Sequence, residues 1–397
     1  MKTSKKKIGL LPKLFAAIAV GILIGFISPD WVIRLLNCFR DTFGQFIKFI
    51  VPFIIIGLVT PAIVETGKNA GKLLLMTIAI AWVSTIVFGF YAYGVSAAVF
   101  PKIMTGALGD MSAAKTFPAF FALQIPPVMD VVSSLVVALI IGFGAIVIKS
   151  EVLSKGVFEL REIVMLTLAK AFVPLLPFYI LTVLADLTAS GKLSVIGGSS
   201  VKIMVVSIVT VNSVLFFQYI IAGVIVRKNP FKCLWNMMPA YLTGLGCCSS
   251  AATIPYTMAQ TRKNGVSEET TSLVIPLCSS MHMAGSMANV VIYSAGVLVL
   301  LGQDLPLVNY VQYILMVSFI AVASPGVPGG VVLATSAIAE SALGFSPERY
   351  AIMIALYLAL DGVGTSVNLT GDGAVALIVD RFNRGDHDKR NLGAGIA

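Results

Sequence analysis

The sequence contains few charged residues for its length. Asp, Glu, Lys and Arg make up only 12% of its 397 residues, whereas 57% of the residues are hydrophobic. A soluble protein carries about a quarter charged residues, so the composition excludes an ordinary soluble domain. Long apolar runs with few charges are typical of helices that cross a membrane. We therefore expect an all-α polytopic membrane protein.

Cysteine and histidine are also scarce. The five cysteines form no CxxC pair, so we interpret them as small apolar filling residues and expect no disulfide framework. The two histidines are too few for a His-rich metal site. We expect no cofactor, and the chain carries no pattern of an enzyme built around one.

The net charge of +9 lies in short basic clusters between the apolar runs, which does not indicate a nucleic-acid partner. The clusters are Lys2 with Lys5 to Lys7, Arg227–Lys228, Arg262–Lys263 and Lys389–Arg390. Cytoplasmic loops of membrane proteins carry such an excess of Lys and Arg. The first apolar run lacks a small-residue cleavage motif, so we expect a retained helix. Both termini are then cytoplasmic, and the chain lies in the plasma (inner) membrane.

Eight apolar runs are long enough to cross the ~30 Å hydrocarbon core as helices. They lie near residues 9–28, 43–65, 72–100, 127–149, 163–187, 201–226, 269–301 and 347–378. Two further apolar segments, 233–260 and 306–345, do not suit a simple crossing.

Basic clusters flank the segment 233–260 on both sides. A single crossing would place one cluster outside, against the positive-inside bias. Its middle, GCCSSAATIP, is rich in small and hydroxyl residues and does not favour a continuous span. We therefore expect a re-entrant hairpin, since irregular backbone at membrane depth is tolerated only against protein or a water-filled cavity.

The segment 306–345 lies in a stretch without basic residues, because no Lys or Arg occurs between Lys263 and Arg349. The prolines and glycines of its middle, ASPGVPGG, break a helix. With both ends outside, it forms a second hairpin of opposite orientation. The C-terminal half then contains two inverted units whose broken helices converge near the membrane midplane. The alternative is two ordinary spans and ten crossings, which would leave the Arg262–Lys263 cluster outside.

The last span contains an unusually polar stretch, LDGVGTSVNLTGDG. Asp361, Thr365, Asn368 and Asp372 follow the spacing i, i+4, i+7, i+11, which on a helix places all four on one stripe about 16 Å long. An aspartate at bilayer depth costs at least about 2.5 kcal/mol, so such residues face protein interior or water. Their oxygens suit a hard cation or a substrate ammonium. A stripe that only joins helices is the alternative.

The glycines of the same stretch are expected to permit close backbone approach and a loosened helix. They are Gly362, Gly364, Gly371 and Gly373. In the preceding span, PLCSSMHMAGSMANVV places hydroxyl, imidazole and carboxamide groups around a Met-Ala-Gly break. His282 in this segment is either a hydrogen-bonded packing residue or a functional group, and its depth in the span favours neither reading alone.

These residues resemble the dicarboxylate/amino acid:cation symporter family, which has the glutamate-transporter fold. The likeness covers essentially the whole chain and is motif-specific from about residue 200 to 385. The resemblance implies eight spans, two oppositely oriented hairpins and a homotrimer in membrane lipid. It also implies scaffold spans 1–2 in 1–70, span 3 of a mobile transport domain in 71–105, scaffold spans 4–5 in 106–195, the transport-domain core in 196–385, and a cytoplasmic tail in 386–397.

The resemblance also implies roles for individual residues. The serine-rich tip of the family's first hairpin resembles Ser249 to Pro255, and its Gly-Val/Ile-Pro-Gly turn is matched by Gly326 to Gly329. By this likeness Asp361 takes the substrate ammonium, Asn368 holds the substrate carboxylate, and Asp372 lines a sodium site. The implied substrate site comprises Ser249, Ser250, Thr253, Ser286, Val327, Pro328, Gly329, Asp361, Thr365 and Asn368. The implied Na+ ligands are Cys278, Ser280, His282, Ser324, Asn368 and Asp372.

Three departures from the family pattern bear on function. The family's Asn-Met-Asp-Gly-Thr is here residues 282–286, so the carboxylate that helps to bind a deep sodium ion is Ala284. The third span, around LLLMTIAIAWVST, is also expected to be poor in the oxygens that would complete that site. The arginine that clamps an acidic substrate is Gly364, and a hairpin-tip position that carries arginine in some relatives is Cys248.

We therefore expect symport of a small neutral amino acid, such as serine, threonine or alanine, coupled to Na+ or H+. Ala284 and His282 predict fewer coupled sodium ions than in glutamate carriers, with a proton in place of one. Symport of a dicarboxylate or acidic amino acid is the alternative, although a buried second carboxylate would lack a partner.

Other classes of protein fit the sequence less well. An ion channel needs only one pathway, whereas two opposed hairpins suit alternating access. An enzyme is not expected, because two aspartates about 16 Å apart on one helix cannot form a dyad that shares a proton at about 3 Å. The sequence also indicates no Ser–His pair.

Overall fold

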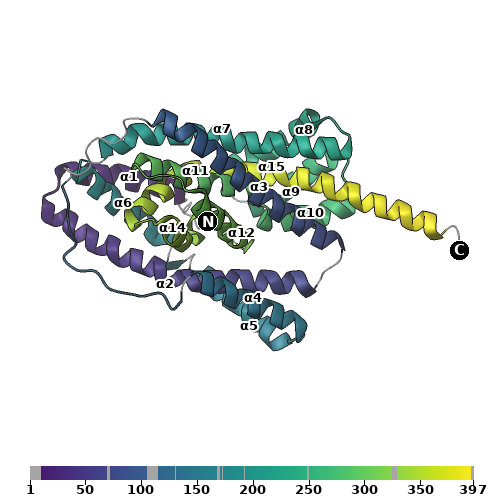
Figure 1. The fold of residues 1–397 in the computed structure, drawn as a ribbon, viewed down its shortest axis with the longest axis horizontal. Helices are drawn as coiled ribbons and strands as arrows, with labels where there is room; N and C mark the ends of the chain where they lie inside the picture. The colour runs from purple at the N-terminus through teal and green to yellow at the C-terminus, as the bar shows by residue number, and fades with distance from the viewer. Residues whose placement is uncertain are drawn as a thin grey trace, which may run out of the picture.

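The computed structural model of the chain describes residues 10–68, 72–104, 115–129, 131–167, 170–171, 173–191, 193–247, 250–323 and 329–394. These residues form helices and connecting segments without any strand, as the composition predicts (Figure 1). In chain order the helices are α1 (Leu10–Ile27), α2 (Asp30–Lys68), α3 (Lys72–Ile103), α4 (Val131–Val147), α5 (Glu151–Thr167), α6 (Val173–Ala189), α7 (Leu193–Val226), α8 (Pro230–Cys247), α9 (Ser250–Lys263), α10 (Glu268–Met281), α11 (Ala284–Leu300), α12 (Leu307–Ala323), α13 (Gly330–Ala334), α14 (Ser336–Leu343) and α15 (Pro347–Ala394).

Four helical stretches in the described part of the chain are long and apolar enough to cross a membrane. They are Leu73–Ile103, Gly198–Val226, Glu268–Leu300 and Arg349–Asn383. Shorter apolar helices cover Ala16–Ile27, Pro52–Pro61, Val136–Val147, Pro177–Ala189 and Leu307–Ala321. The prediction of a helical membrane protein is confirmed, and the number of crossings stays a prediction.

The helices pack in two groups. In the first, α1 lies along α6, and α2 packs against α4, α5 and α6. In the second, α3, α7, α11 and α15 pack on one another, and α8, α9 and α10 pack against α15 (Figure 1). Helix α12 touches both groups, because it contacts α2 on one side and α3 on the other, and α14 packs against α12 and α2.

Each of the two awkward segments folds back on itself. The Nζ atom of Lys228 donates to the carbonyl of Asn264 at 2.6 Å, so the chain before α8 and the chain after α9 lie together. At the other segment, Asn309 Nδ2 donates to the carbonyl of Ala342 at 2.9 Å and joins the start of α12 to the end of α14. Both segments therefore return to the place where they began, which is the geometry expected of a hairpin.

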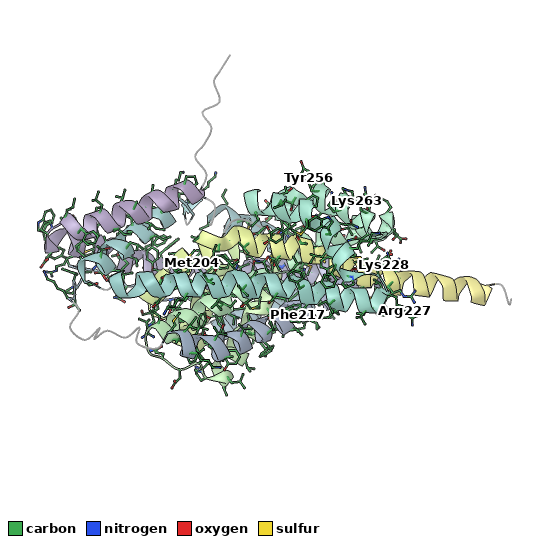
Figure 2. The ribbon with its side chains drawn as sticks, turned by 90° about the horizontal axis from the view of Figure 1, so that it is seen from above. Met204, Phe217, Arg227, Lys228, Tyr256 and Lys263 are labelled. Atoms are coloured by element: carbon green, nitrogen blue, oxygen red, sulfur yellow. The ribbon has the colours of Figure 1, made fainter. Side chains whose placement is uncertain are left out.

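The basic residues around the first hairpin gather at one end of the molecule. Figure 2 shows Arg227, Lys228 and Lys263 near the point where α15 projects from the body of the protein. This clustering is the pattern expected if both basic clusters lie on one side of a membrane.

Several helix ends follow local sequence signals. Ser267 caps α10, because its hydroxyl accepts from the backbone N–H of Thr270, and Asp380 of α15 accepts from the Ser267 hydroxyl at 2.6 Å. Helix α14 ends at Leu343 and is capped by Gly344, whose φ of +66° is the left-handed conformation that glycine adopts without strain. Pro347 occupies the first position of α15, where its missing N–H costs nothing.

The predicted spans and domain boundaries stay predictions. Of the span predicted at 163–187, the structure describes the end of α5 at Thr167 and α6 from Val173 to Ala189, with residues 168–169 and 172 outside the described part. The tail predicted at 386–397 is helical through Ala394, as part of α15.

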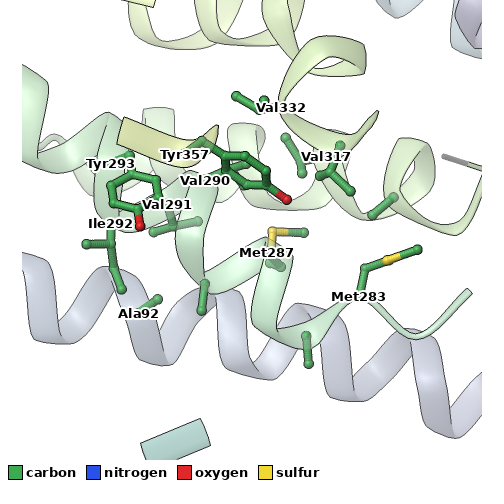
Figure 3. Close-up of a cluster of buried hydrophobic side chains, with 14 of the residues drawn as sticks. Ala92, Met283, Met287, Val290, Val291, Ile292, Tyr293, Val317, Val332 and Tyr357 are labelled. Atoms are coloured by element: carbon green, nitrogen blue, oxygen red, sulfur yellow. The ribbon is translucent and has the colours of Figure 1, made fainter. Parts of the chain in front are cut away.

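Helix α11 lies at the centre of the core. Its side chains from Ala284 to Leu298 are buried without exception. Figure 3 shows Tyr293 of α11 close to Tyr357 of α15, with Ala92 of α3 on one side and Val332 of α13 on the other. A helix buried on all sides has no solvent face, so any polar side chain on α11 must find its partner inside the protein.

Candidate substrate and cation site

The chain breaks its helix between α10 and α11, inside the span predicted at 269–301. His282 ends α10 with φ −91° and ψ 98°, and its N–H donates to the carbonyl of Cys278 at 2.8 Å. The N–H of Met283 donates to Thr85 Oγ1 of α3 at 3.3 Å. The break predicted at the Met-Ala-Gly stretch is therefore confirmed, and it exposes backbone groups that side chains from other helices satisfy.

Asn368 of α15 caps the start of α11. Its Oδ1 atom accepts from the backbone N–H groups of Gly285 and Ser286, at 2.8 and 3.2 Å. Its Nδ2 atom donates to Ser286 Oγ at 2.8 Å and contacts Met283 Sδ at 3.4 Å. The carboxamide is thus fully engaged with α11, and a role of Asn368 towards substrate or Na+ stays a prediction.

The glycines of α15 allow neighbouring groups to approach its backbone, as predicted. A Cβ atom on Gly371 would lie 2.4 Å from Gln218 Oε1, and one on Gly373 would lie 2.6 Å from the hydroxyl oxygen of Tyr219. On α11, a Cβ atom on Gly285 would lie 2.7 Å from the carbonyl oxygen of Gly364. Helix α15 departs from helical geometry at Leu360, with φ −122° and ψ 15°, directly before the polar stripe.

Asp361 connects α15 to the second hairpin. Its Oδ2 atom accepts from the backbone N–H of Gly329 at 2.8 Å, and its side chain is 4% exposed. Gly329 has a φ of +73°, and a Cβ atom there would lie 2.6 Å from Leu358 Cδ2, so only glycine suits this turn. The hydroxyl of Tyr357 lies beside both Asp361 and Ser286. Asp361 thus lies where Gly329, directly before α13, meets α15 and α11.

His282 is the centre of a second polar cluster. Its Nδ1 atom lies 2.9 Å from Asp372 Oδ1, and its Nε2 atom lies 3.1 Å from both Ser84 Oγ and Gln218 Nε2. Four segments therefore meet at this imidazole: α3, α7, the α10–α11 break and α15. His282 and Asp372 are each 1% exposed.

Sequence reasoning missed part of this cluster. Ser84 and Thr85 of the third span reach the α10–α11 break, and whether this span lacks the oxygens of a deep sodium site stays a prediction. The sequence indicated no Ser–His pair, whereas Ser84, His282 and Asp372 lie in one hydrogen-bonded row. The available signal was the Ser-Thr pair in a mainly apolar helix.

The other predicted site residues have different environments. Ser250, Thr253 and Thr365 are buried, and Thr253 Oγ1 donates to the carbonyl of Ser250 at 2.8 Å. Ser280 is exposed, and Cys278 is buried as a free thiol. The remaining predicted positions lie outside the described residues: Ser249, Ser324, Val327 and Pro328.

Two buried oxygens next to His282 have no hydrogen-bond partner among the described residues. They are Asp372 Oδ2 and Gln218 Oε1. A carboxylate oxygen with a free lone pair is the kind of ligand that a hard cation prefers. The cluster therefore fits a coupling cation on the Oδ2 side of Asp372, whereas the Oδ1 side is taken by His282.

The fold and the site together define a helical membrane protein whose polar residues gather where broken helices and hairpin ends meet, an arrangement found in secondary transporters. The chain belongs to the Sodium:dicarboxylate symporter family, whose sequence pattern matches residues 10–382. This is a family of transporters and not of enzymes, so the Ser84–His282–Asp372 row is not a hydrolase site.

Individual relatives carry several names. The chain is 24% identical to the serine/threonine transporter SstT of Streptococcus suis over 340 residues, which are 83% of the chain and 94% of that relative. It is 29% identical to excitatory amino acid transporter 3 of Mus musculus over 174 residues, 44% of the chain and 33% of the relative. It is also 29% identical to the neutral amino acid transporter B(0) of Mus musculus over 160 residues, 39% of the chain and 29% of the relative. The two mammalian matches thus cover about a third of the length of each relative.

Proposed function

We propose that this protein is a secondary active transporter that couples a cation, Na+ or H+, to the uptake of a small neutral amino acid. The observation that carries the proposal is that α15 has a buried carboxylate at Asp361 and no side chain at Gly364, where an acidic substrate would need a basic partner. Asp361 is buried where Gly329 meets α11 and α15, and Gly364 follows it on the same helix.

The buried carboxylate of Asp361 supports an amino acid as substrate. A buried charge is costly unless it is paired, and a substrate ammonium supplies the opposite charge. A dicarboxylate without an amine would bring further negative charge to Asp361 and leave its carboxylate without a counter-ion. Dicarboxylates are therefore the weaker candidate, although the family's description includes them.

The absence of a basic clamp supports a neutral side chain. Among the described residues, Arg40 is the one buried cation, and it is paired with Asp41 and Asp186 in the first helix group. A second substrate carboxylate would thus be buried without a partner. The serine/threonine transporter that matches most of the chain is a relative whose name agrees with this reading.

The wider organisation belongs to the same proposal. The first helix group serves as a scaffold, and the second group, with the hairpins, moves the site across the membrane. The cation binds on the open side of Asp372. We further propose a homotrimer in the plasma (inner) membrane with cytoplasmic termini.

The test is uptake of radiolabelled serine into proteoliposomes under imposed Na+ or H+ gradients. Unlabelled serine, threonine, alanine, aspartate, glutamate and succinate compete in parallel. We expect gradient-driven uptake that serine, alanine and threonine inhibit strongly and that aspartate and succinate do not. Equal inhibition by aspartate or succinate would overturn the neutral assignment.

A further inference from the structure

Asn289 is a buried carboxamide that the packing of α11 does not fully use. It lies one helical turn after Ser286, and its side chain is 0% exposed. Its Oδ1 atom accepts from Ser207 Oγ of α7 at 2.7 Å. Its Nδ2 atom has no hydrogen-bond partner among the residues that the structure describes. Buried polar groups are nearly always paired, so an unpaired donor here requires an explanation.

The neighbours of Asn289 fix the direction of this donor. Ser207 Oγ also lies 2.9 Å from the Tyr293 hydroxyl, so the carboxamide oxygen is held towards α7. The amino group then faces α15. A Cβ atom on Gly364 would lie only 2.5 Å from Asn289 Nδ2, and 3.7 Å from the backbone nitrogen of Ser286. The unpaired donor therefore lies against the position of α15 that carries no side chain.

Gly364 is next to the carboxylate proposed for the substrate ammonium. Residues three apart on a helix are neighbours, about 5–6 Å between their Cβ atoms, so Asp361 and Gly364 border one region. The Tyr357 hydroxyl, which lies beside both Asp361 and Ser286, borders it as well. Asp361 thus offers an acceptor and Asn289 an unpaired donor beside the same glycine. These two groups complement the ammonium and an acceptor atom of one small amino acid.

We propose that Asn289 is a specificity-determining residue whose Nδ2 atom donates to an acceptor atom on the substrate side chain. This inference rests on the proposed function and narrows its substrate class. Amino acids with a hydroxyl or carboxamide side chain are favoured over alkyl side chains of equal size. A site built around a polar contact rejects the analogue that lacks it, because the buried donor then stays unpaired.

The first measurement uses the wild-type protein in proteoliposomes. Serine and 2-aminobutyrate have nearly the same shape, but a methyl group replaces the hydroxyl in the second. We expect serine to inhibit the uptake of labelled alanine about tenfold more strongly than 2-aminobutyrate does. Equal inhibition by the two compounds would overturn the proposal without any variant.

The second measurement uses Asn289→Leu, which keeps the approximate volume and removes the donor. We expect the preference for serine over 2-aminobutyrate to disappear while alanine is still transported. Asn212→Leu is the matched control, because the Nδ2 and Oδ1 atoms of Asn212 are both paired, with Ile208 and Tyr241. A wild-type preference retained in Asn289→Leu would contradict the proposal.

Ser207→Ala provides an independent variant if Asn289→Leu does not assemble. It removes the bond that holds the carboxamide oxygen, so we expect a smaller serine preference and unchanged alanine uptake. A Ser207→Ala protein with the full preference would count against the proposed orientation. If wild-type protein takes up no amino acid under either gradient, the proposed function fails as well. If it transports serine and 2-aminobutyrate equally, only the role of Asn289 fails.

Discussion

The imidazole of His282 and the carboxylate of Asp372 form a buried pair, with 2.9 Å between Nδ1 and Oδ1. Their side chains are 0% and 1% exposed. The contact joins the α10–α11 break to the last helix, so the partner of Asp372 is a residue whose backbone departs from helical geometry. Asp372 Oδ2 has no partner in the described part of the chain. One oxygen of the carboxylate therefore contacts His282, and the other is available to a cation.

We predict that Asp372→Asn abolishes cation-coupled uptake while the protein still inserts and assembles. The substitution keeps the shape of the side chain and removes the full negative charge that a hard cation prefers. The measurement is serine uptake with and without a Na+ gradient. Asp30→Asn is the control, since Asp30 forms an exposed ion pair with Lys115, and such pairs contribute little. Unchanged sodium dependence in Asp372→Asn would show that coupling lies elsewhere.

A second prediction concerns the number of coupled ions. Ala284 carries no carboxylate, and His282 takes one oxygen of Asp372, so this cluster offers Na+ fewer charged ligands than Asn-Met-Asp-Gly-Thr would. We expect fewer sodium ions per substrate than in a glutamate carrier measured side by side. The measurement is the reversal potential of substrate flux at several Na+ and pH gradients. His282→Asn, which removes the imidazole, is expected to change this number. The prediction is refuted if the wild-type protein couples as many sodium ions per substrate as the glutamate carrier, and if neither pH nor His282→Asn alters this number.

The sequence predicts those parts of the site that depend on order along one helix. The spacing of Asp361 and Asp372, together with the glycines between them, is a local property of α15, so a polar stripe with close backbone approach follows from helical geometry. The return of each hairpin is predictable for a similar reason, because the placement of basic residues and of proline and glycine is visible in the chain. Lys228 and Asn309 make the contacts that close the two hairpins.

Contacts between distant helices were not predictable in the same way. Ser84 and Gln218 lie on mainly apolar helices far apart in the chain, and nothing in their spacing indicates that both reach His282. Such pairings depend on how α3 and α7 pack, which hydropathy does not encode. Asn289 illustrates the same point, since the orientation of its carboxamide is set by Ser207, 82 residues away.

A third prediction tests the close packing at Gly364. A Cβ atom there would meet Asn289 Nδ2 at 2.5 Å, and overpacking of this kind costs about 1–3 kcal/mol. We expect Gly364→Ala to lower the thermal stability and serine uptake of purified protein. Gly94→Ala is the control, because nothing lies within 4 Å of its Cβ position, and alanine is favoured over glycine inside a helix by about 0.5–1 kcal/mol. Asn289→Ala combined with Gly364→Ala should recover stability, and a double variant no more stable than Gly364→Ala would contradict the proposed clash.

The last prediction tests whether the two hairpins have opposite orientation. Lys263 ends the first hairpin beside Arg227 and Lys228 (Figure 2), in the basic region expected to be cytoplasmic. Arg349 follows the second hairpin, and its guanidinium donates to Gln303 Oε1 at 3.0 Å, so residues before and after that hairpin meet at one place. If the hairpins are inverted, these two places lie on opposite faces of the membrane.

We therefore expect a membrane-impermeant maleimide to label Arg349→Cys in intact cells and to label Lys263→Cys only after permeabilisation. Gln303→Cys serves as a matched control, because its contact with Arg349 requires it to label from the same side. Wild-type protein gives the background from native cysteines, of which Cys38, Cys233 and Cys278 are buried. Labelling of Lys263→Cys and Arg349→Cys from one side would exclude the inverted arrangement. Alternating access through two opposed hairpins would then be excluded with it, because both gates would open to the same compartment.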